Sequence, residues 1–250
     1  MSAYILKIIA LITMTIDHIG AVFELHDAFR CIGRIAFPLY ALMVVDGCEL
    51  LLKDEKRFKR YMIFMCIMAA ISECGFDLAF YGRPWDTEMQ NQLFQFASYN
   101  IGIYITDYFR KPYISVPVWL LIIYINFTGR FGYFSSGIIL MLIFREYLKH
   151  YKKMSLPTRL LCCGVIIAIL VYNELFDGLF YYLHDLDTVQ RYIQRRGLHI
   201  SNVNMHTYLA VPFLALYNGE YGNIPKPFRF LYRHYYPVHL YVLALLNYII

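Results

Sequence analysis

Long apolar runs separated by short polar stretches dominate the chain. Several runs reach the roughly 20 residues that an α-helix needs to cross about 30 Å of hydrocarbon. We therefore predict an all-α, polytopic transmembrane helical bundle of about nine spans, or eight to ten if the short run 205–217 is re-entrant or tilted. The runs are residues 3–25, 32–52, 60–80, 93–109, 113–128, 134–148, 160–183, 205–217 and 230–249.

Composition agrees with this pattern. Hydrophobic residues make up 59% of the 250 residues and charged residues 16%, whereas about a quarter of a soluble domain is charged. No linker, low-complexity tract or internal repeat interrupts the runs, so residues 1–250 are predicted to form a single domain. The first run lacks a basic start and a small-residue cleavage site, and we expect a retained span instead of a cleaved signal peptide.

The charged residues predict an orientation, because Lys and Arg collect on cytoplasmic loops. The odd-numbered loops carry Arg30, Arg83, Arg130, Arg191, Arg195 and Arg196. The even-numbered loops carry Lys53, Lys56, Arg57, Lys59, Arg60, Arg110, Lys111, Arg145, Lys149, Lys152, Lys153, Arg159, Lys226, Arg229 and Arg233. This excess predicts a cytoplasmic amino terminus. It also accounts for the basic clusters without nucleic acid, which we do not expect as a partner.

A few ionisable residues lie inside the apolar runs. The stretch "LITMTIDHIGAVF" holds Asp17 and His18, and an acid at the centre of a span costs roughly 2.5–3.5 kcal/mol on insertion scales. A rise of ~1.5 Å per residue places His18 about 21 Å along the first span and Glu73 about 20 Å along the third. Asp77 follows one turn later, and His239 lies near the middle of the last span. These groups meet in one layer if their helices are neighbours.

This layer suggests acid–base chemistry. Adjacent helical residues point about 100° apart, so Asp17 is poorly placed to orient His18. A carboxylate from another span is better placed, and we predict that Glu73 or Asp77 holds the ring. A histidine held in one tautomer can take a proton near neutral pH. We therefore predict that His18 is a general base.

Each of these residues also has a structural interpretation. Asp17 could simply bond Arg34, and His18 with an acid could form a packing latch. Arg34 could snorkel to the surface or hold an anion, and His239 could belong to an interfacial aromatic belt. The histidines lack the spacing of metal ligands, and no glycine-rich phosphate loop precedes a helix, so we expect no metal site.

Five stretches together resemble the TraX family of bacterial membrane proteins. They are "LKIIALITMTIDHIGAVF", "RCIGRIAFPLYALMVVDG", "RYMIFMCIMAAISECGFDLAF", "ALYNGEYG" and "HYYPVHLYVL", in this order. The chain departs from the family in "NQLFQFASYNIG", where relatives often have an Asn-Val-aromatic-aromatic-Thr stretch, and in "SECGF", which lacks a proline. The resemblance carries over Asp17, His18, Gly33, Arg34, Phe37, Pro38, Glu73, Asp77, Asn218, Gly219, Tyr236, Pro237 and His239.

The resemblance implies a multi-pass protein of the bacterial cytoplasmic membrane that is an acyltransferase. The donor would be acetyl-coenzyme A or another acyl-CoA, with no permanently bound cofactor. The acceptor would be an amine or hydroxyl on a small molecule, a peptide amino terminus or a glycan. The basic stretch 53–60 could meet the phosphates of the donor, although topology alone explains it. The alternative is a proton-coupled transporter or a non-catalytic binding protein.

Specific roles follow for the predicted site. His18 would take the proton of the acceptor, either in direct transfer or through an acyl-histidine. Arg34 and His239 would stabilise the oxyanion or hold a polar group of the acceptor. Tyr236 and Asn218 would complete the substrate site.

Overall fold

The computed structural model describes residues 1–184 and 202–249, and the regular elements in these residues are helices. The all-α prediction is confirmed for this part of the chain. The helices are α1 (Ala3–Val22), α2 (Ala28–Gly33), α3 (Ala36–Leu51), α4 (Glu55–Tyr81), α5 (Gln92–Phe109), α6 (Pro112–Thr128), α7 (Phe134–His150), α8 (Leu156–His184), α10 (Val211–Ala215) and α11 (Lys226–Ile249), with the 3-10 helices η1 (Tyr151–Lys153) and η2 (Asn202–Ala210).

Four helical segments of the described chain are long and apolar enough to cross a membrane. They are Ala3–Val22, Ala28–Leu51, Glu55–Tyr81 and Leu156–Leu175. The second combines α2 and α3, and α6 is a shorter apolar helix. The run 205–217 forms most of η2 and α10, which are too short to cross ~30 Å of hydrocarbon as one helix. These segments make the chain a membrane protein, and the count of nine spans stays a prediction.

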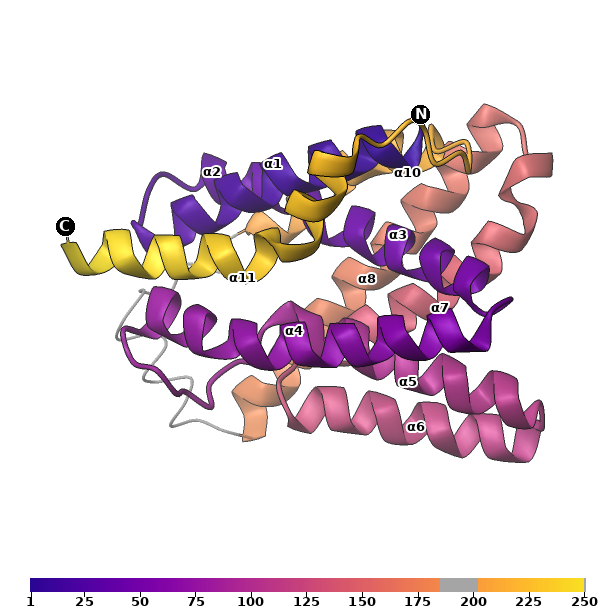
Figure 1. The fold of residues 1–250 in the computed structure, drawn as a ribbon, viewed down its shortest axis with the longest axis horizontal. Coiled ribbons are helices and arrows are strands. Elements are labelled where there is room, and N and C mark those ends of the chain that lie inside the picture. The colour runs from indigo at the N-terminus through magenta and orange to yellow at the C-terminus, as the bar shows by residue number, and fades with distance from the viewer. Residues whose placement is uncertain (185–201, 250) are drawn as a thin grey trace.

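Successive long helices run back and forth along the bundle (Figure 1). Residues 52–54, 110–111, 151–155 and 216–225 therefore lie at one end, which we call the basic end because most Lys and Arg gather there. Residues 23–27, 82–91 and 129–133 lie at the opposite end. Arg191, Arg195 and Arg196, which entered the topology prediction, lie outside the described residues.

The helix ends follow local sequence signals. Asp54 caps α4 by accepting a hydrogen bond from the Arg57 amide at 3.1 Å, and Gly82 follows the last residue of α4 with a φ of 70°, which suits glycine. Asn91 caps α5 by accepting from the Leu93 amide at 2.9 Å. Such caps satisfy amide groups that have no partner inside the helix. The 82–91 connection is thus held at both of its ends.

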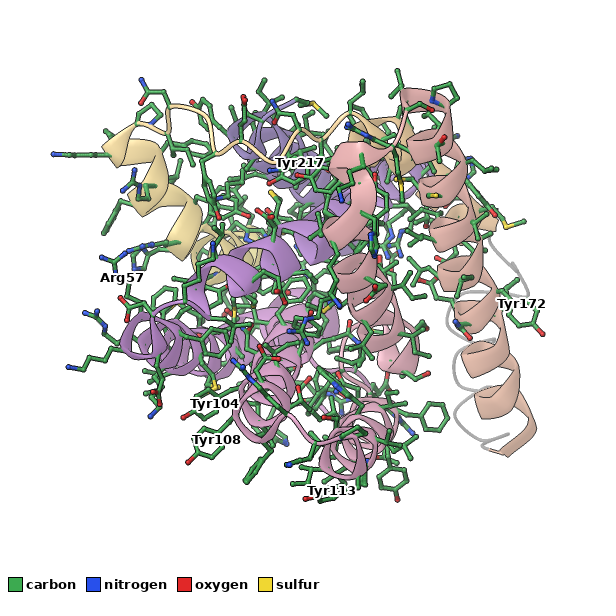
Figure 2. All side chains as sticks on the ribbon, turned by 90° about the vertical axis from the view of Figure 1, so that its right-hand side faces the viewer. Arg57, Tyr104, Tyr108, Tyr113, Tyr172 and Tyr217 are labelled. Carbon is green, nitrogen blue, oxygen red and sulfur yellow. The ribbon has the colours of Figure 1, made fainter. Side chains whose placement is uncertain are left out.

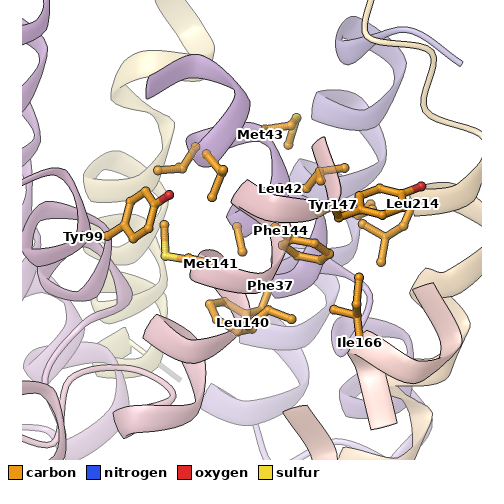
Figure 3. Close-up of a cluster of buried hydrophobic side chains, with 14 of the residues drawn as sticks. Phe37, Leu42, Met43, Tyr99, Leu140, Met141, Phe144, Tyr147, Ile166 and Leu214 are labelled. Atoms are coloured by element: carbon orange, nitrogen blue, oxygen red, sulfur yellow. The ribbon is translucent and has the colours of Figure 1, made fainter. Parts of the chain in front are cut away.

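The main apolar core lies between α3, α7, α8 and α10, and α5 contributes Tyr99 (Figure 3). Its largest fully buried side chains include Tyr99, Tyr217, Phe58 and Phe144. On the periphery, Figure 2 shows Tyr108, Tyr113 and Tyr172 directed outward, with exposed fractions of 71%, 73% and 70%. Exposed aromatic side chains of this kind are typical of surfaces that face the membrane and its interfaces.

Candidate functional site

A cavity of about 1020 Å³ lies between α1, α2, α3, α4, α5 and α11. Its lining follows α4 from Tyr61 to Tyr81, a distance of about 30 Å at the helical rise. Most of the wall is apolar. The polar cluster on it consists of Asp17, His18, Arg30 and Arg34. A mostly apolar cavity with a few convergent polar groups is the usual form of a small-molecule site.

Two histidines from distant parts of the chain meet at this cavity. Nδ1 of His18 lies 2.7 Å from Nε2 of His239, and Nδ1 of His239 lies 2.9 Å from the backbone oxygen of Tyr235. A carbonyl oxygen only accepts, so His239 donates through Nδ1. In the neutral ring its Nε2 then accepts, and His18 donates through Nδ1. This chain of bonds sets one tautomer for both rings.

The second nitrogen of the His18 ring, Nε2, carries the lone pair in this tautomer. It has no hydrogen-bond partner among the described residues, and His18 lines the cavity. The edges of Phe80 and Tyr236 pack against the ring, with centroids at 5.3 Å and 6.2 Å. A lone pair that faces the cavity without a protein partner is placed to accept a proton from a bound molecule.

Asp17 forms an ion-pair cluster beside His18. Its carboxylate contacts Arg30 at 2.9 Å and Arg34 at 3.2 Å, so the interpretation that Asp17 bonds Arg34 is confirmed. Gly33 permits this approach, because a Cβ at that position would overlap the side chain of Asp17. Since a buried charge is costly without a partner, the two guanidinium groups stabilise Asp17 inside the bundle.

Arg34 also reaches across the bundle. Its Nη1 donates to the hydroxyl of Tyr133 at 3.2 Å and to Oδ1 of Asn204 at 3.4 Å. Its Nε is buried without a partner in the described part of the chain. Burial raises the pKa of Tyr133 to about 12, and the charge of Arg34 acts in the opposite direction. Tyr133 is therefore a neutral phenol at physiological pH, and its proton is available to donate.

The two acids of α4 have other partners. Oε2 of Glu73 accepts hydrogen bonds from the backbone and side-chain nitrogens of Asn91, at 3.0 Å and 2.5 Å. Oδ2 of Asp77 accepts from the Asp86 amide at 2.8 Å. The prediction that one of these acids orients His18 is corrected, because His239 occupies that position. Sequence spacing gave the depth of each residue but not the direction in which its helix turns it.

Glu73 and Asp77 instead hold the 82–91 segment, which forms part of the cavity wall. Glu88, Met89 and Gln90 line the cavity. The Gln90 amide donates to the Arg130 oxygen at 3.0 Å, and the Gly132 amide donates to the Gln90 oxygen at 3.2 Å. The acids therefore support a wall that continues, through residues 130–132, to Tyr133 and Arg34.

Asn218 is not part of this cavity. It is exposed at the basic end, where its side chain donates to Glu220 at 2.9 Å and its amide donates to the Met1 oxygen at 3.0 Å. Met1 precedes His18 by 17 residues, about 25 Å along a helix. The structure thus places His18, Asp17, Arg34 and Tyr236 on the wall of one cavity, with His239 bonded to His18, and leaves Asn218 at the other end of the bundle.

The sequence interpretation missed several residues of the cluster. Arg30 had a usable signal, because it precedes Arg34 by one helical turn in "RCIGR" and can face the same partner. Tyr133 and Asn204 had none, since each reaches Arg34 from a segment distant in sequence, Tyr133 from the start of α7 and Asn204 from η2. Among the described residues, no group of three His, Cys, Asp or Glu side chains is arranged to hold a metal ion.

Comparison with known proteins identifies the family. The family model described as "TraX protein" matches residues 2–247. The chain belongs to the TraX family. Over 184 residues, this TraX-family chain is 27% identical to "Uncharacterized protein RP591" of Rickettsia prowazekii (strain Madrid E), covering 73% of the chain and 68% of that protein. No solved structure matches the chain.

Proposed function

We propose that this protein is an acyltransferase embedded in the bacterial cytoplasmic membrane, with its basic end and amino terminus in the cytoplasm. It would move an acyl group, in the simplest case acetyl, from acetyl-coenzyme A to an amine or hydroxyl acceptor. The observation that carries the proposal is the bond chain from Tyr235 through His239 to His18, which leaves Nε2 of His18 as a base on the cavity wall.

The proposed reaction needs one base. Nε2 of His18 removes the proton of the acceptor as its nitrogen or oxygen attacks the thioester carbonyl. The tetrahedral intermediate then expels the thiolate, which takes the proton back from the imidazolium. His239 acts as a positioning residue, because its Nε2 accepts from Nδ1 of His18 and stabilises the positive charge that forms on that ring.

The negative oxygen of the tetrahedral intermediate needs hydrogen-bond donors. The buried Nε of Arg34 and the hydroxyl proton of Tyr133 are donors beside the same cavity. Both are held in place, Arg34 by Asp17 and Tyr133 by Arg34. Preorganised donors of this kind lower the barrier because they do not need to reorient during the reaction.

The test is chemical turnover. Purified protein is incubated with labelled acetyl-coenzyme A and a panel of amines, peptides with free amino termini and sugars. Loss of thioester and transfer of label, absent in His18→Ala, are expected. A proton-coupled transporter would instead leave the thioester intact and accumulate a solute in proteoliposomes under a pH gradient, which would overturn the proposal.

A further inference from the structure

The cavity extends from His18 toward the basic end, where cationic residues of α1 and α11 flank it. Tyr232 and Arg233 of α11 line the cavity. Lys7 of α1 lies over the ring of Tyr232, with 5.1 Å from its Nζ to the ring centroid, and 6.0 Å from that of Tyr221. The basic stretch 53–60, considered from sequence as a donor site, contributes no lining residue. At this end of the cavity the nearby cations are thus Arg233, which lines it, and Lys7, which lies over the ring of the lining residue Tyr232.

These cations repel one another. The positive charges of Arg229 and Arg233 both act on Lys7, and Asp46 acts on it with the opposite sign. Arg229 and Arg233 are one turn apart on α11 and share a face. None of the three forms an ion pair in the described chain, whereas Arg57, Lys59, Arg145 and Lys149 at the same end each pair with a carboxylate. Like charges gathered without an ion-paired carboxylate favour binding of an anion.

Aromatic rings surround this group. Tyr232 stacks with Tyr40 and Phe228, at centroid distances of 6.1 Å for both pairs. The ring of Tyr4 meets Phe228 edge-on at 5.0 Å. Flat aromatic faces beside cations are the arrangement that binds nucleotides, because bases stack on the rings while cations neutralise phosphates.

We infer that Lys7, Arg229 and Arg233 bind the phosphate groups of a nucleotide-bearing acyl donor at the basic end of the cavity. Arg233 precedes His239 by six residues and Lys7 precedes His18 by eleven, which correspond to about 9 Å and about 16 Å along their helices. An extended donor anchored at these cations therefore reaches His18 with its thioester. The inference rests on the proposed function only for the identity of the ligand as the acyl donor.

Binding of adenosine 3′,5′-bisphosphate, which carries no acyl group, tests the site without turnover. Affinity is measured by titration calorimetry on the purified full-length protein. The double variant Arg229→Gln/Arg233→Gln should weaken binding at least about tenfold, as expected for loss of charge-assisted bonds. The matched double variant Lys56→Gln/Arg57→Gln removes the same charge at the same end and should change the affinity less than about twofold. Equal weakening by both would overturn the inference, because it would reflect only the general positive charge of that end.

Two further measurements exclude misfolding and lipid as explanations. Arg233→Lys keeps the charge and should retain most of the affinity, and melting temperatures check that each variant is folded. Anionic lipid headgroups offer the same phosphate chemistry, so binding is repeated in nanodiscs of phosphatidylcholine and of phosphatidylglycerol. Similar affinity in both supports the nucleotide. Loss of binding only in phosphatidylglycerol would assign the cations to a lipid and overturn the inference.

The outcomes also separate this inference from the proposed function. Acyl transfer that does not depend on Arg229 and Arg233, with no nucleotide binding there, would refute the site and leave the enzyme. Nucleotide binding at these residues without any loss of thioester would support the nucleotide site and refute the proposed acyltransferase activity.

Discussion

The histidine pair of α1 and α11 meets at the cavity wall, whereas the acid pair of α4 contacts the connection that forms part of that wall. Glu73 and Asp77 accept hydrogen bonds from Asn91 and Asp86, which belong to the connection that follows their own helix. His18 contacts His239, 221 positions away, and its other nitrogen is left at the cavity. The origin of a buried polar group's partners therefore indicates its role. The hydrogen bonds of Glu73 and Asp77 hold the backbone of the 82–91 connection. The lone pair on Nε2 of His18 is free of partners in the described chain and lies on the cavity wall, where it can react.

Replacing His18 should have the largest effect. General-base catalysis typically contributes 10²–10⁴-fold, and we expect His18→Ala to lower the single-turnover rate of acyl transfer by about that factor. The melting temperature should change little, because alanine removes the polar group and leaves His239 bonded to Tyr235. If His18→Ala transfers acyl groups as fast as the wild type, the histidine pair has no catalytic role that the acid pair lacks.

Replacing His239 should have a smaller effect that depends on the substituent. His239→Leu removes the acceptor for Nδ1 of His18, and we expect a loss of roughly 10–100-fold in turnover, the range seen when a supporting partner is removed. His239→Gln offers an amide oxygen at a similar distance from the backbone and should recover a large part of the rate. Equal rates in both variants would show that the contact is only packing.

The acids should affect stability more than turnover. Glu73→Gln and Asp77→Asn can keep the bonded oxygen, but each places an amide NH2 where Oε1 or Oδ1 is buried without a partner in the described chain, and we expect about 1–3 kcal/mol less stability. Turnover of the folded protein should stay within about threefold of the wild type. Chemical denaturation and single-turnover assays on the same samples measure both quantities. A hundredfold loss of rate without loss of stability would show instead that Glu73 or Asp77 takes part in catalysis.

Labelling from the two sides of the membrane should leave activity unchanged, and it determines which end of the bundle faces the cytoplasm. Cysteines introduced at Lys56 and Lys152 should react with an impermeant thiol reagent only from the cytoplasm, and one at Trp85, which is 71% exposed, only from outside. The unmodified protein, with its six cysteines, is the control. Labelling with the opposite sidedness would place the 82–91 connection in the cytoplasm and reverse the proposed approach of donor and acceptor.

Much of the fold follows from local sequence. The predicted run 60–80 lies within α4, and the runs 93–109 and 113–128 differ from α5 and α6 by one residue at their starts. Apolar runs of this length form helices because hydrocarbon leaves no other partner for backbone amides. The run 32–52 was less well predicted, since a turn at Arg34 and Ile35 separates α2 from α3.

The sequence by itself determined the helical class, the basic end and the position of His18 along its helix, because these depend on composition and on a constant rise per residue. Only the tertiary structure decided which groups meet. His239 and not Glu73 faces His18, and Tyr133 and Asn204 reach Arg34 from segments distant in the chain. The physical reason is that helix rotation and neighbour choice are set by side-chain packing between segments far apart in the chain, and spacing along one helix carries no information about that packing.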